Sequence, residues 1–490
     1  MVFRPTLDSE SAVPLYRQLY EYIAGRIRLG QMAKGERLPA TRELAGLLGL
    51  NRTTVSAAYE LLESEGLIAG HVGRGSFVTA AAVADAPRLD WGRLLERAEA
   101  APASPAGTGA APLSFATSRP ARDLFPLDDF RAACAAVLAR ADLADVLQLG
   151  SPGGYEPLRR HLLDDARKEG IAGAGDDLMI ANGCQQALDL IGRVLVRPGD
   201  SVVVEDPVYP GLKSLFAEMG VHLVGVAAGG DGFDLAGCER ALRADRVRLV
   251  VVTPNFQNPT GNTLPLAARR ALLAMAQQAG VPVIENDPYH DLRYEGEDLP
   301  AMKRLDERGN AVLLRSFSKL SFPGLRVGWV VGPKPLLDRL RQAKQAADLH
   351  TDQLSQAVLL EFAVSGRLEA HRRRILKAGA ERLAATLRAC AECLPAGTRV
   401  TRPQGGMNVW VRLPEPLDAG ELLDRAQREG VDYLPGRWFA VARFEPGALR
   451  LSFAGLTVEE IRRGLSVLGR VCKAEVDRAA RSFEPAPAMV

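Results

Sequence analysis

The chain has 490 residues, of which 47% are apolar and 24% are charged, and its formal net charge is +2. This composition is typical of a globular protein and excludes a disordered or fibrous one. A chain of this length exceeds one ordinary hydrophobic core, so we expect at least two domains. The near-zero net charge does not indicate the class of partner.

The sequence predicts a cytoplasmic protein with no membrane partner. Polar residues and prolines interrupt the first segment, so we expect no signal peptide, and no apolar run is long enough to cross a bilayer. Six cysteines in so long a chain favour a reducing compartment over a disulfide framework. Cys390 and Cys393 form a lone C-x-x-C pair without nearby histidines, so no metal site is expected.

The first 80 residues predict helix, helix, short turn, helix and hairpin. Asn51 is a favourable N-cap for the third helix, and Gly66 ends it. This order of elements is that of a winged helix-turn-helix, a DNA-binding fold. We expect helices from Pro14 to about Leu29, from Leu38 to Gly49 and from Arg52 to Glu65, and short strands over residues 67–70 and 74–78.

Charge alone does not predict DNA binding, because residues 1–80 hold nine Lys or Arg and eight Asp or Glu. A nucleic-acid-binding domain is usually more basic. A small winged helix that binds a protein is therefore the alternative. The side chains best placed to contact phosphates and base edges are Arg42, Arg52, Thr53, Thr54, Ser56 and, at the tip of the wing, Arg74.

A linker is predicted after this domain, because residues 80–112 contain twelve alanines and four prolines. A short amphipathic stretch over residues 90–100 is expected to form a helix within it. The sequence therefore predicts a DNA-binding domain over residues 1–80, a linker over 81–112, a large domain over 113–482 and a frayed tail over 483–490.

From Leu113 to about Gly332, helical and apolar strand patterns alternate, which predicts a mainly parallel sheet covered by helices on both faces. A long helical stretch follows, from Pro335 to about Leu394. The remainder predicts a smaller α/β portion at the C-terminal end of the large domain.

The segment that ends in Lys319 gives the strongest indication of chemistry. An apolar strand over residues 311–314 is followed by Ser316, Ser318 and Lys319, and Arg326 comes seven residues later. An amine, two hydroxyls and a guanidinium at one strand end suit an aldehyde cofactor that carries a phosphate. The amine would form a Schiff base, and the other groups would hold the phosphate.

Four further motifs each follow an expected strand. Together with the Lys319 segment, their order and spacing resemble the fold-type I aminotransferases, which use pyridoxal 5'-phosphate (PLP). The resemblance extends from about Leu113 to the C-terminus. The motifs are a glycine-led turn into a helix over residues 181–188, an aromatic turn over 205–211, Asn-Phe-Gln-Asn-Pro-Thr-Gly over 255–261, and a strand ending in a carboxylate over 281–289.

The resemblance implies a role for each residue around the cofactor ring. Lys319 would link to the aldehyde, and Asp287 would pair with the ring nitrogen and keep it protonated. Asn258 and Tyr289 would hydrogen-bond the phenolic oxygen of the ring, and Tyr209 would stack on its face.

The phosphate would be held by five residues, namely the backbone amides of Cys184 and Gln185 and the side chains of Ser316, Ser318 and Arg326. Arg450 matches the arginine that takes the α-carboxylate of an amino acid in this family, for which a planar guanidinium is suited. Considered alone, Arg450 could equally be a surface arginine on an edge strand.

The N-terminal region resembles the GntR family, at Leu-Pro-x-x-Arg-Glu-Leu-Ala over residues 38–45 and at Gly-x-Gly-x-Phe-Val over 73–78. A winged helix followed by an aminotransferase-like domain resembles the MocR subfamily of GntR regulators. This resemblance implies a bacterial transcription factor whose effector is PLP or its adduct with an amino acid or amine. It also implies a homodimer that reads a repeated or palindromic double-stranded DNA operator.

One position departs from the family, which commonly has a tyrosine that reaches the phosphate of the neighbouring subunit. Leu149 stands there, so one phosphate contact is missing unless Tyr155 substitutes for it. Conversely, the residues around Lys319 and over 344–351 are similar to working aminotransferases of the aminoadipate and kynurenine type. Two alternatives therefore stay open: an active aminotransferase that kept a winged helix, and a large domain that only dimerises.

Overall fold

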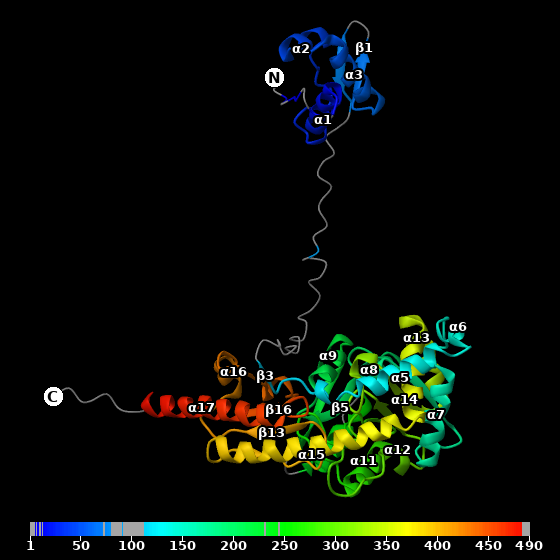
Figure 1. The fold of residues 1–490 in the computed structure, drawn as a ribbon, viewed down its shortest axis with the longest axis vertical. Helices are drawn as coiled ribbons and strands as arrows, with labels where there is room; N and C mark the ends of the chain where they lie inside the picture. The colour runs from blue at the N-terminus through cyan, green and yellow to red at the C-terminus, as the bar shows by residue number, and fades with distance from the viewer. Residues whose placement is uncertain are drawn as a thin grey trace, which may run out of the picture. The chain divides into compact units, whose positions relative to one another are not determined.

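The computed structural model divides into two compact units, residues 1–98 and 99–490, which are described separately (Figure 1). The described residues are 5, 7, 8, 11, 13–71, 74–79, 91, 112–229, 232–243 and 246–482. Apart from residue 91, the helix expected over residues 90–100 lies outside them, as does the tail over 483–490.

The described part of the N-terminal unit folds into helices and a hairpin in the order that the sequence predicts. The amide oxygen of Asn51 accepts a hydrogen bond from the backbone N–H of Thr53 at 3.1 Å, so Asn51 is the predicted N-cap. The elements are α1 (Leu15–Arg28), α2 (Thr41–Leu48) and α3 (Arg52–Ser64), and the antiparallel strands β1 (Ile68–His71) and β2 (Gly75–Val78).

The large unit contains an eight-stranded sheet in the order β4-β11-β10-β9-β8-β5-β6-β7. Only β11 and β7 run antiparallel to their neighbours, so the sheet is mainly parallel, as predicted. Its strands are β4 (Asp176–Ala181), β5 (Ser201–Asp206), β6 (His222–Gly229), β7 (Gly232–Phe233), β8 (Val247–Val252), β9 (Val283–Asn286), β10 (Ala311–Ser316) and β11 (Gly328–Pro333).

Helices cover both faces of this sheet. Alternate residues of β4 show this, because Leu178 and Ile180 pack into one apolar cluster while Met179 and Ala181 pack into another. The helices are α5 (Leu127–Leu138), α6 (Leu143–Val146), α7 (Glu156–Lys168), α8 (Gly183–Leu195), α9 (Pro210–Glu218), α10 (Leu235–Leu242), α11 (Leu266–Gln278), α12 (Met302–Leu305), α13 (Lys334–Asp348) and α14 (Gln353–Val364), with 3₁₀ turns η1 (Arg122–Leu124) and η2 (Pro323–Leu325).

The C-terminal portion packs two long helices, α15 (Arg367–Cys393) and α17 (Val458–Ser482), against a small antiparallel sheet in the order β12-β13-β16-β15 (Figure 1). The short strand β14 pairs in parallel with β3 (Leu113–Ser114). This pairing places the first described strand of the unit against its C-terminal portion. The other elements are β12 (Arg399–Val400), β13 (Asn408–Arg412), α16 (Ala419–Arg428), β14 (Val431–Asp432), β15 (Leu434–Pro435), η3 (Gly436–Trp438) and β16 (Ala448–Ser452).

All six cysteines are free thiols. Within the part of the chain that the structure describes, no helix has the length and apolar character needed to cross a bilayer. The same residues contain no group of three His, Cys, Asp or Glu side chains placed to hold a metal ion.

A tight turn before α7 packs directly on β4 and gives a test of this packing. Gly154 has φ +102°, and a Cβ atom there would lie 2.6 Å from Cβ of Ile180. We expect Gly154→Ala to lower the free energy of unfolding by about 1–3 kcal/mol, because it adds both backbone strain and a steric overlap.

The matched control is Gly175→Ala, where a Cβ atom meets nothing within 4 Å and φ is not positive. Urea unfolding followed by tryptophan fluorescence measures both variants. It reports mainly on the large unit, because three of the four tryptophans, Trp329, Trp410 and Trp438, lie in it. Equal stability of the two variants would contradict the described turn.

Candidate functional site

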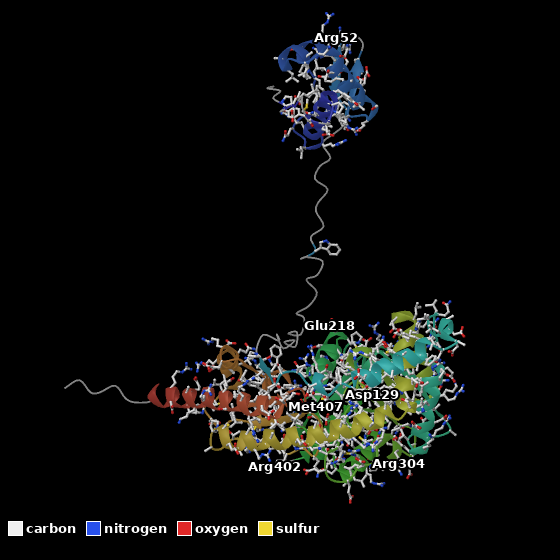
Figure 2. All side chains as sticks on the ribbon, viewed as in Figure 1. Arg52, Asp129, Glu218, Arg304, Arg402 and Met407 are labelled. Carbon is white, nitrogen blue, oxygen red and sulfur yellow. The ribbon has the colours of Figure 1, made fainter. Side chains whose placement is uncertain are left out.

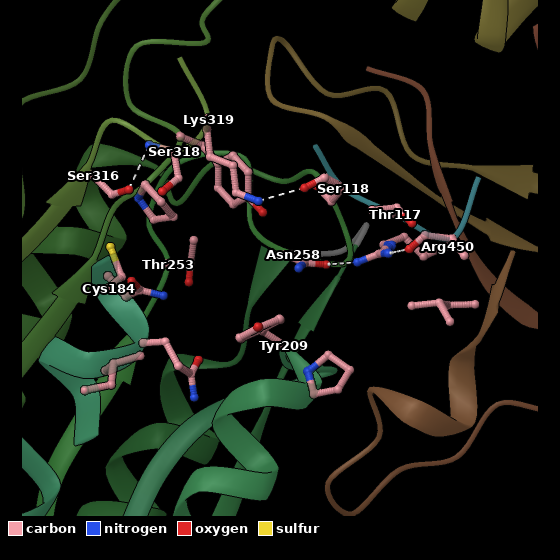
Figure 3. A pocket seen from close by; sticks show the side chains of 18 of the residues that line it. Thr117, Ser118, Cys184, Tyr209, Thr253, Asn258, Ser316, Ser318, Lys319 and Arg450 are labelled. Carbon is pink, nitrogen blue, oxygen red and sulfur yellow. Dashed lines mark hydrogen bonds between the residues drawn. The ribbon is translucent and has the colours of Figure 1, made fainter. Parts of the chain in front are cut away.

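A cavity of about 340 Å³ opens where strands of the main sheet end (Figure 3). It is lined by residues that follow the C-terminal ends of β5, β8, β9 and β10, which is where open parallel sheets bind ligands. Of the eleven residues predicted for cofactor or carboxylate, ten line it: Cys184, Gln185, Tyr209, Asn258, Tyr289, Ser316, Ser318, Lys319, Arg326 and Arg450.

The amine of Lys319 reaches into this cavity (Figure 3). Its Nζ atom donates a hydrogen bond to the backbone carbonyl of Ser118 at 2.7 Å and lies 5.5 Å from the ring centre of Tyr289. Tyr289 is buried, whereas Tyr209 is 39% exposed. The lysine is thus held by a neutral acceptor, which an incoming ligand can replace without breaking an ion pair.

One wall of the cavity is the N-terminal end of α8. The side chain of Asn182, the residue before this helix, does not cap it but donates to Asp348 at 2.8 Å. The first N–H groups of the helix, at Cys184 and Gln185, therefore have no side-chain cap and are available to an anion. Burial raises the pKa of the Cys184 thiol to about 12, which agrees with a role for its backbone rather than its sulfur.

Two hydroxyls and a guanidinium stand beside this helix end. The Ser316 hydroxyl accepts a hydrogen bond from the N–H of Ser318 at 2.9 Å, and Arg326 donates to the carbonyl of Asn182 at 3.2 Å. Gly183 has φ +81°, and a Cβ atom there would lie 2.7 Å from the Arg326 guanidinium. The cradle fits a phosphate dianion because it offers N–H, O–H and cationic groups without a carboxylate in the cavity lining.

Arg450 lies at the opposite side of the cavity, on β16. Its side chain is only 3% exposed, and it donates to the amide oxygen of Asn258 at 3.0 Å and to the carbonyl of Ala116. The buried Nε atom of Arg450 has no hydrogen-bond partner, and no carboxylate pairs with it among the described residues. Burial lowers its pKa to about 10, so the guanidinium stays charged at neutral pH and lacks an anion.

Asp287 is the one predicted residue that does not line this cavity. It is fully buried, while its chain neighbours Asn286 and Pro288 do line the cavity. The amide nitrogen of Asn255 donates to both carboxylate oxygens of Asp287 at 3.0 Å. Asp287 instead lines a neighbouring polar cavity of about 650 Å³, together with Asn255.

Leu149 stands where the family commonly has a tyrosine, and Tyr155 is the nearby tyrosine in the sequence. Leu149 is 73% exposed. Tyr155 is buried in the apolar cluster that contains Leu158 and Ile180, and its hydroxyl oxygen is buried as well.

The sequence did not indicate the segment Ala116–Ser118, which lines the cavity and supplies the carbonyls that accept from Arg450 and Lys319. These contacts use backbone atoms some 200 residues away from Lys319 in the chain. No side-chain pattern marks them. The pairing of β3 with β14, and the hydrogen bond of 2.9 Å from the N–H of Ser452 to the carbonyl of Phe115, bring this segment to the cavity. Thr253 and Leu434 also line the cavity and were not predicted.

The residues predicted to contact DNA all lie in the N-terminal unit. Arg42 is on α2, and Arg74 is in the turn between β1 and β2. The remainder, Arg52, Thr53, Thr54 and Ser56, are in the first turns of α3, with Arg52 on the surface of the unit (Figure 2). The three arginines are exposed and make no hydrogen bond or ion pair with a side chain that the structure describes.

Comparison with known proteins assigns each unit to a protein family. Residues 125–468 match the family "Aminotransferase class I and II", and residues 15–78 match "Bacterial regulatory proteins, gntR family". The 2-aminoadipate transaminase of Thermus thermophilus is 39% identical over 74% of this chain and 90% of its own. The probable rhizopine catabolism regulatory protein MocR of Rhizobium meliloti is 30% identical over 94% of both chains.

Among solved structures, LysN, an alpha-aminoadipate aminotransferase from Thermus thermophilus complexed with N-(5'-phosphopyridoxyl)-L-leucine, has a TM-score of 0.70. It is 37% identical and covers 76% of this chain and 94% of its own. The large unit is thus a class I and II aminotransferase domain. With its GntR domain and its full-length relatives, the chain belongs to the MocR subfamily of GntR-type transcriptional regulators, which confirms the predicted fold class and PLP as the cofactor.

Lys319→Ala tests the assigned lysine. We expect the protein to lose the visible absorbance of lysine-bound cofactor completely, because no other lysine lines the cavity. Lys334→Ala, which removes an exposed lysine paired with Asp338 at 2.7 Å, should leave the band unchanged. A band that survives Lys319→Ala would mean that another lysine binds the cofactor.

Proposed function

We propose that this regulator senses an amino acid or amine through PLP held in the cavity and changes its binding to a DNA operator in response. The observation that carries this proposal is that one cavity contains both the amine of Lys319 and the buried, carboxylate-free guanidinium of Arg450. An amine-reactive site beside a carboxylate site fits an α-amino acid. A cytoplasmic location agrees with this function.

The cofactor supplies an aldehyde that can exchange one amine for another and a ring that withdraws electrons. In our proposal, Cys184, Gln185, Ser316, Ser318 and Arg326 hold its phosphate. This anchor would fix one end of the group and leave its aldehyde to react with Lys319.

Four further residues would hold the ring. Asn258 and Tyr289 would donate to its phenolic oxygen, and Tyr209 would stack on its face. Asp287 would hold the proton on the ring nitrogen, which its burial favours because a carboxylate in a low-dielectric site attracts a cation strongly.

The amino compound would exchange with Lys319 and place its carboxylate on Arg450. Occupation of Arg450 would give the buried guanidinium its missing anion, so it would favour the conformation in which the C-terminal portion closes on the cavity. An effector shifts an equilibrium only if it binds the two conformations unequally. The contact with Arg450, made in one conformation only, would provide that difference.

We further propose that the protein acts as a homodimer. Leu147, Leu149 and Leu349 are exposed. Their two segments are in contact, because the side chain of Gln353 donates a hydrogen bond to the carbonyl of Gln148 at 2.8 Å. Leucines exposed together favour coverage by another surface. A second copy would cover them and would bring two reading heads to two half-sites. Sedimentation equilibrium tests this, and a monomer at micromolar concentration would exclude it.

A second candidate function is aminotransfer. The 39% identity to a transaminase supports it, as does a cavity lined by Lys319 and Arg450, the residues that we propose for the amine and the carboxylate of the substrate. Incubation of the PLP-loaded protein with single amino acids and 2-oxoglutarate distinguishes the two. Turnover at ordinary enzyme rates, together with DNA binding that ignores every amino compound, would favour the enzyme.

Arg52→Ala tests the DNA contact. An operator is first selected by the full-length protein from random-sequence DNA. We expect weaker binding to it and a salt dependence reduced by about one unit, because one phosphate contact is lost. The cofactor spectrum should not change.

Arg28→Ala is the matched control, because this arginine of α1 pairs with Glu65 at 2.9 Å. It should leave the affinity for the operator nearly unchanged. If both variants weaken binding equally, overall charge and not the position of Arg52 determines the affinity.

Arg450→Ala tests the link between effector and DNA. We expect amino acids to bind roughly tenfold more weakly or worse, because a charge-assisted, two-pronged contact is lost. Their effect on operator affinity should then disappear while PLP stays bound. The control is Arg412→Ala. Arg412 lies on the neighbouring strand β13 and pairs with Glu445, so its loss should preserve the effect of amino acids on operator affinity. An undiminished response in Arg450→Ala would exclude Arg450 as the carboxylate site.

A further inference from the structure

A fully buried arginine lies behind the carboxylate that we assign to the cofactor ring. Arg269 belongs to α11 and is 0% exposed. Its guanidinium donates to the backbone carbonyls of Leu264 at 2.8 Å, Pro300 at 2.8 Å and Pro254 at 3.0 Å. A fourth bond, of 2.6 Å, goes to the amide oxygen of Asn255.

This cation has no ion-pair partner in the part of the chain that the structure describes. Burial lowers the pKa of Arg269, as it does for any cation removed from water. A buried charge is expensive, and an apolar side chain of similar size could fill such a position without that cost. The carbonyl contacts hold both ends of the loop over residues 254–264, at Pro254 and Leu264, and join it to Pro300. The fourth contact differs because it goes to a side chain, that of Asn255.

Asn255 links Arg269 to Asp287. A guanidinium can only donate hydrogen bonds, and a carboxylate can only accept them. The amide oxygen of Asn255 must therefore face Arg269, and its NH₂ group must face Asp287, where it donates to both oxygens at 3.0 Å. The orientation of the amide is thus fixed by two partners of opposite hydrogen-bonding character.

We propose that Arg269 is a positioning residue that acts through Asn255 to hold the Asp287 carboxylate for the ring nitrogen of the cofactor. Without Arg269, the Asn255 amide is free to turn its oxygen toward Asp287, and two acceptors then repel each other. The inference rests on the proposed role of Asp287. It adds a residue from a helix that does not reach the cavity.

The experiment compares Arg269→Lys and Asn255→Ala with Arg270→Gln, all in the full-length protein. Arg270 is the adjacent, exposed arginine of the same helix and serves as the control. Asn255→Ala breaks the link but leaves the loop contacts of Arg269 intact, whereas the lysine keeps the charge and loses the planar fork. Asp287→Ala sets the scale of complete loss.

Two quantities are measured: the affinity for PLP, and the pH at which the visible band of the lysine-bound cofactor changes. We expect roughly tenfold weaker binding in Asn255→Ala and Arg269→Lys, as for a lost hydrogen bond to a charged group. The midpoint should move to higher pH by about one unit. The reason is electrostatic. A proton on the ring nitrogen disfavours a second positive charge on the nitrogen that links the cofactor to Lys319. If the ring proton is held less well, the linking nitrogen keeps its own proton up to a higher pH.

Arg270→Gln should match the wild type in both measurements. The double variant that combines Arg269→Lys with Asn255→Ala should show no larger effect than either single variant. Wild-type affinity and midpoint in folded Asn255→Ala would overturn the inference and leave Arg269 as a tie for the loop. If Arg269→Lys does not fold, Asn255→Ala decides alone. A wild-type protein that shows no visible band with PLP would overturn the proposed function, and this inference with it.

Discussion

The polar contacts of the cavity depend on one constraint, which is that parallel strands end at the same edge of a sheet. β5, β8, β9 and β10 are neighbours in the sheet but are spread over more than a hundred residues of sequence. Their carboxyl ends bring a lysine, two hydroxyls and an asparagine into a cavity of about 340 Å³. The strands themselves are mostly apolar and buried on both faces, so most of their polar side chains lie near the strand ends.

Buried charge is the second feature of this edge, and most of it is balanced by hydrogen bonds rather than by ion pairs. Glu285 accepts from the backbone N–H groups of Met302 and Lys303 at 2.8 Å each, and burial together with Asp287 raises its pKa to about 7. Arg269 donates to carbonyls and an amide. Arg450 has an unused donor. A site that holds its charges in this way is costly without a ligand and gains stability when a complementary ion enters.

The same arrangement suits a sensor as well as an enzyme. Both need a lysine that exchanges amines and a guanidinium that recognises a carboxylate, and the cavity is lined by one lysine and by the buried guanidinium of Arg450, which we propose for these roles. What differs is the use made of binding energy, which an enzyme directs to a transition state and a regulator directs to a change of conformation. The family of the full chain, with a GntR domain at its N-terminal end, favours the second use.

The sequence by itself determined the element order of the N-terminal unit, the alternation of helices and strands up to about residue 332, both families, and ten of the residues that line the cavity, because these depend on local periodicity and on side-chain types after strand ends. Only the tertiary structure decided which backbone atoms complete the site. The pairing of β3 with β14 carries the carbonyls of Ala116 and Ser118 to Arg450 and Lys319, and neither carbonyl has a side-chain signature. The burial of Tyr155, the position of Asp287 behind the cavity, and the chain of contacts from Arg269 through Asn255 likewise follow from packing between distant segments. The pattern of a sequence records the neighbours of a residue along the chain, whereas these contacts depend on how elements far apart in it are brought together.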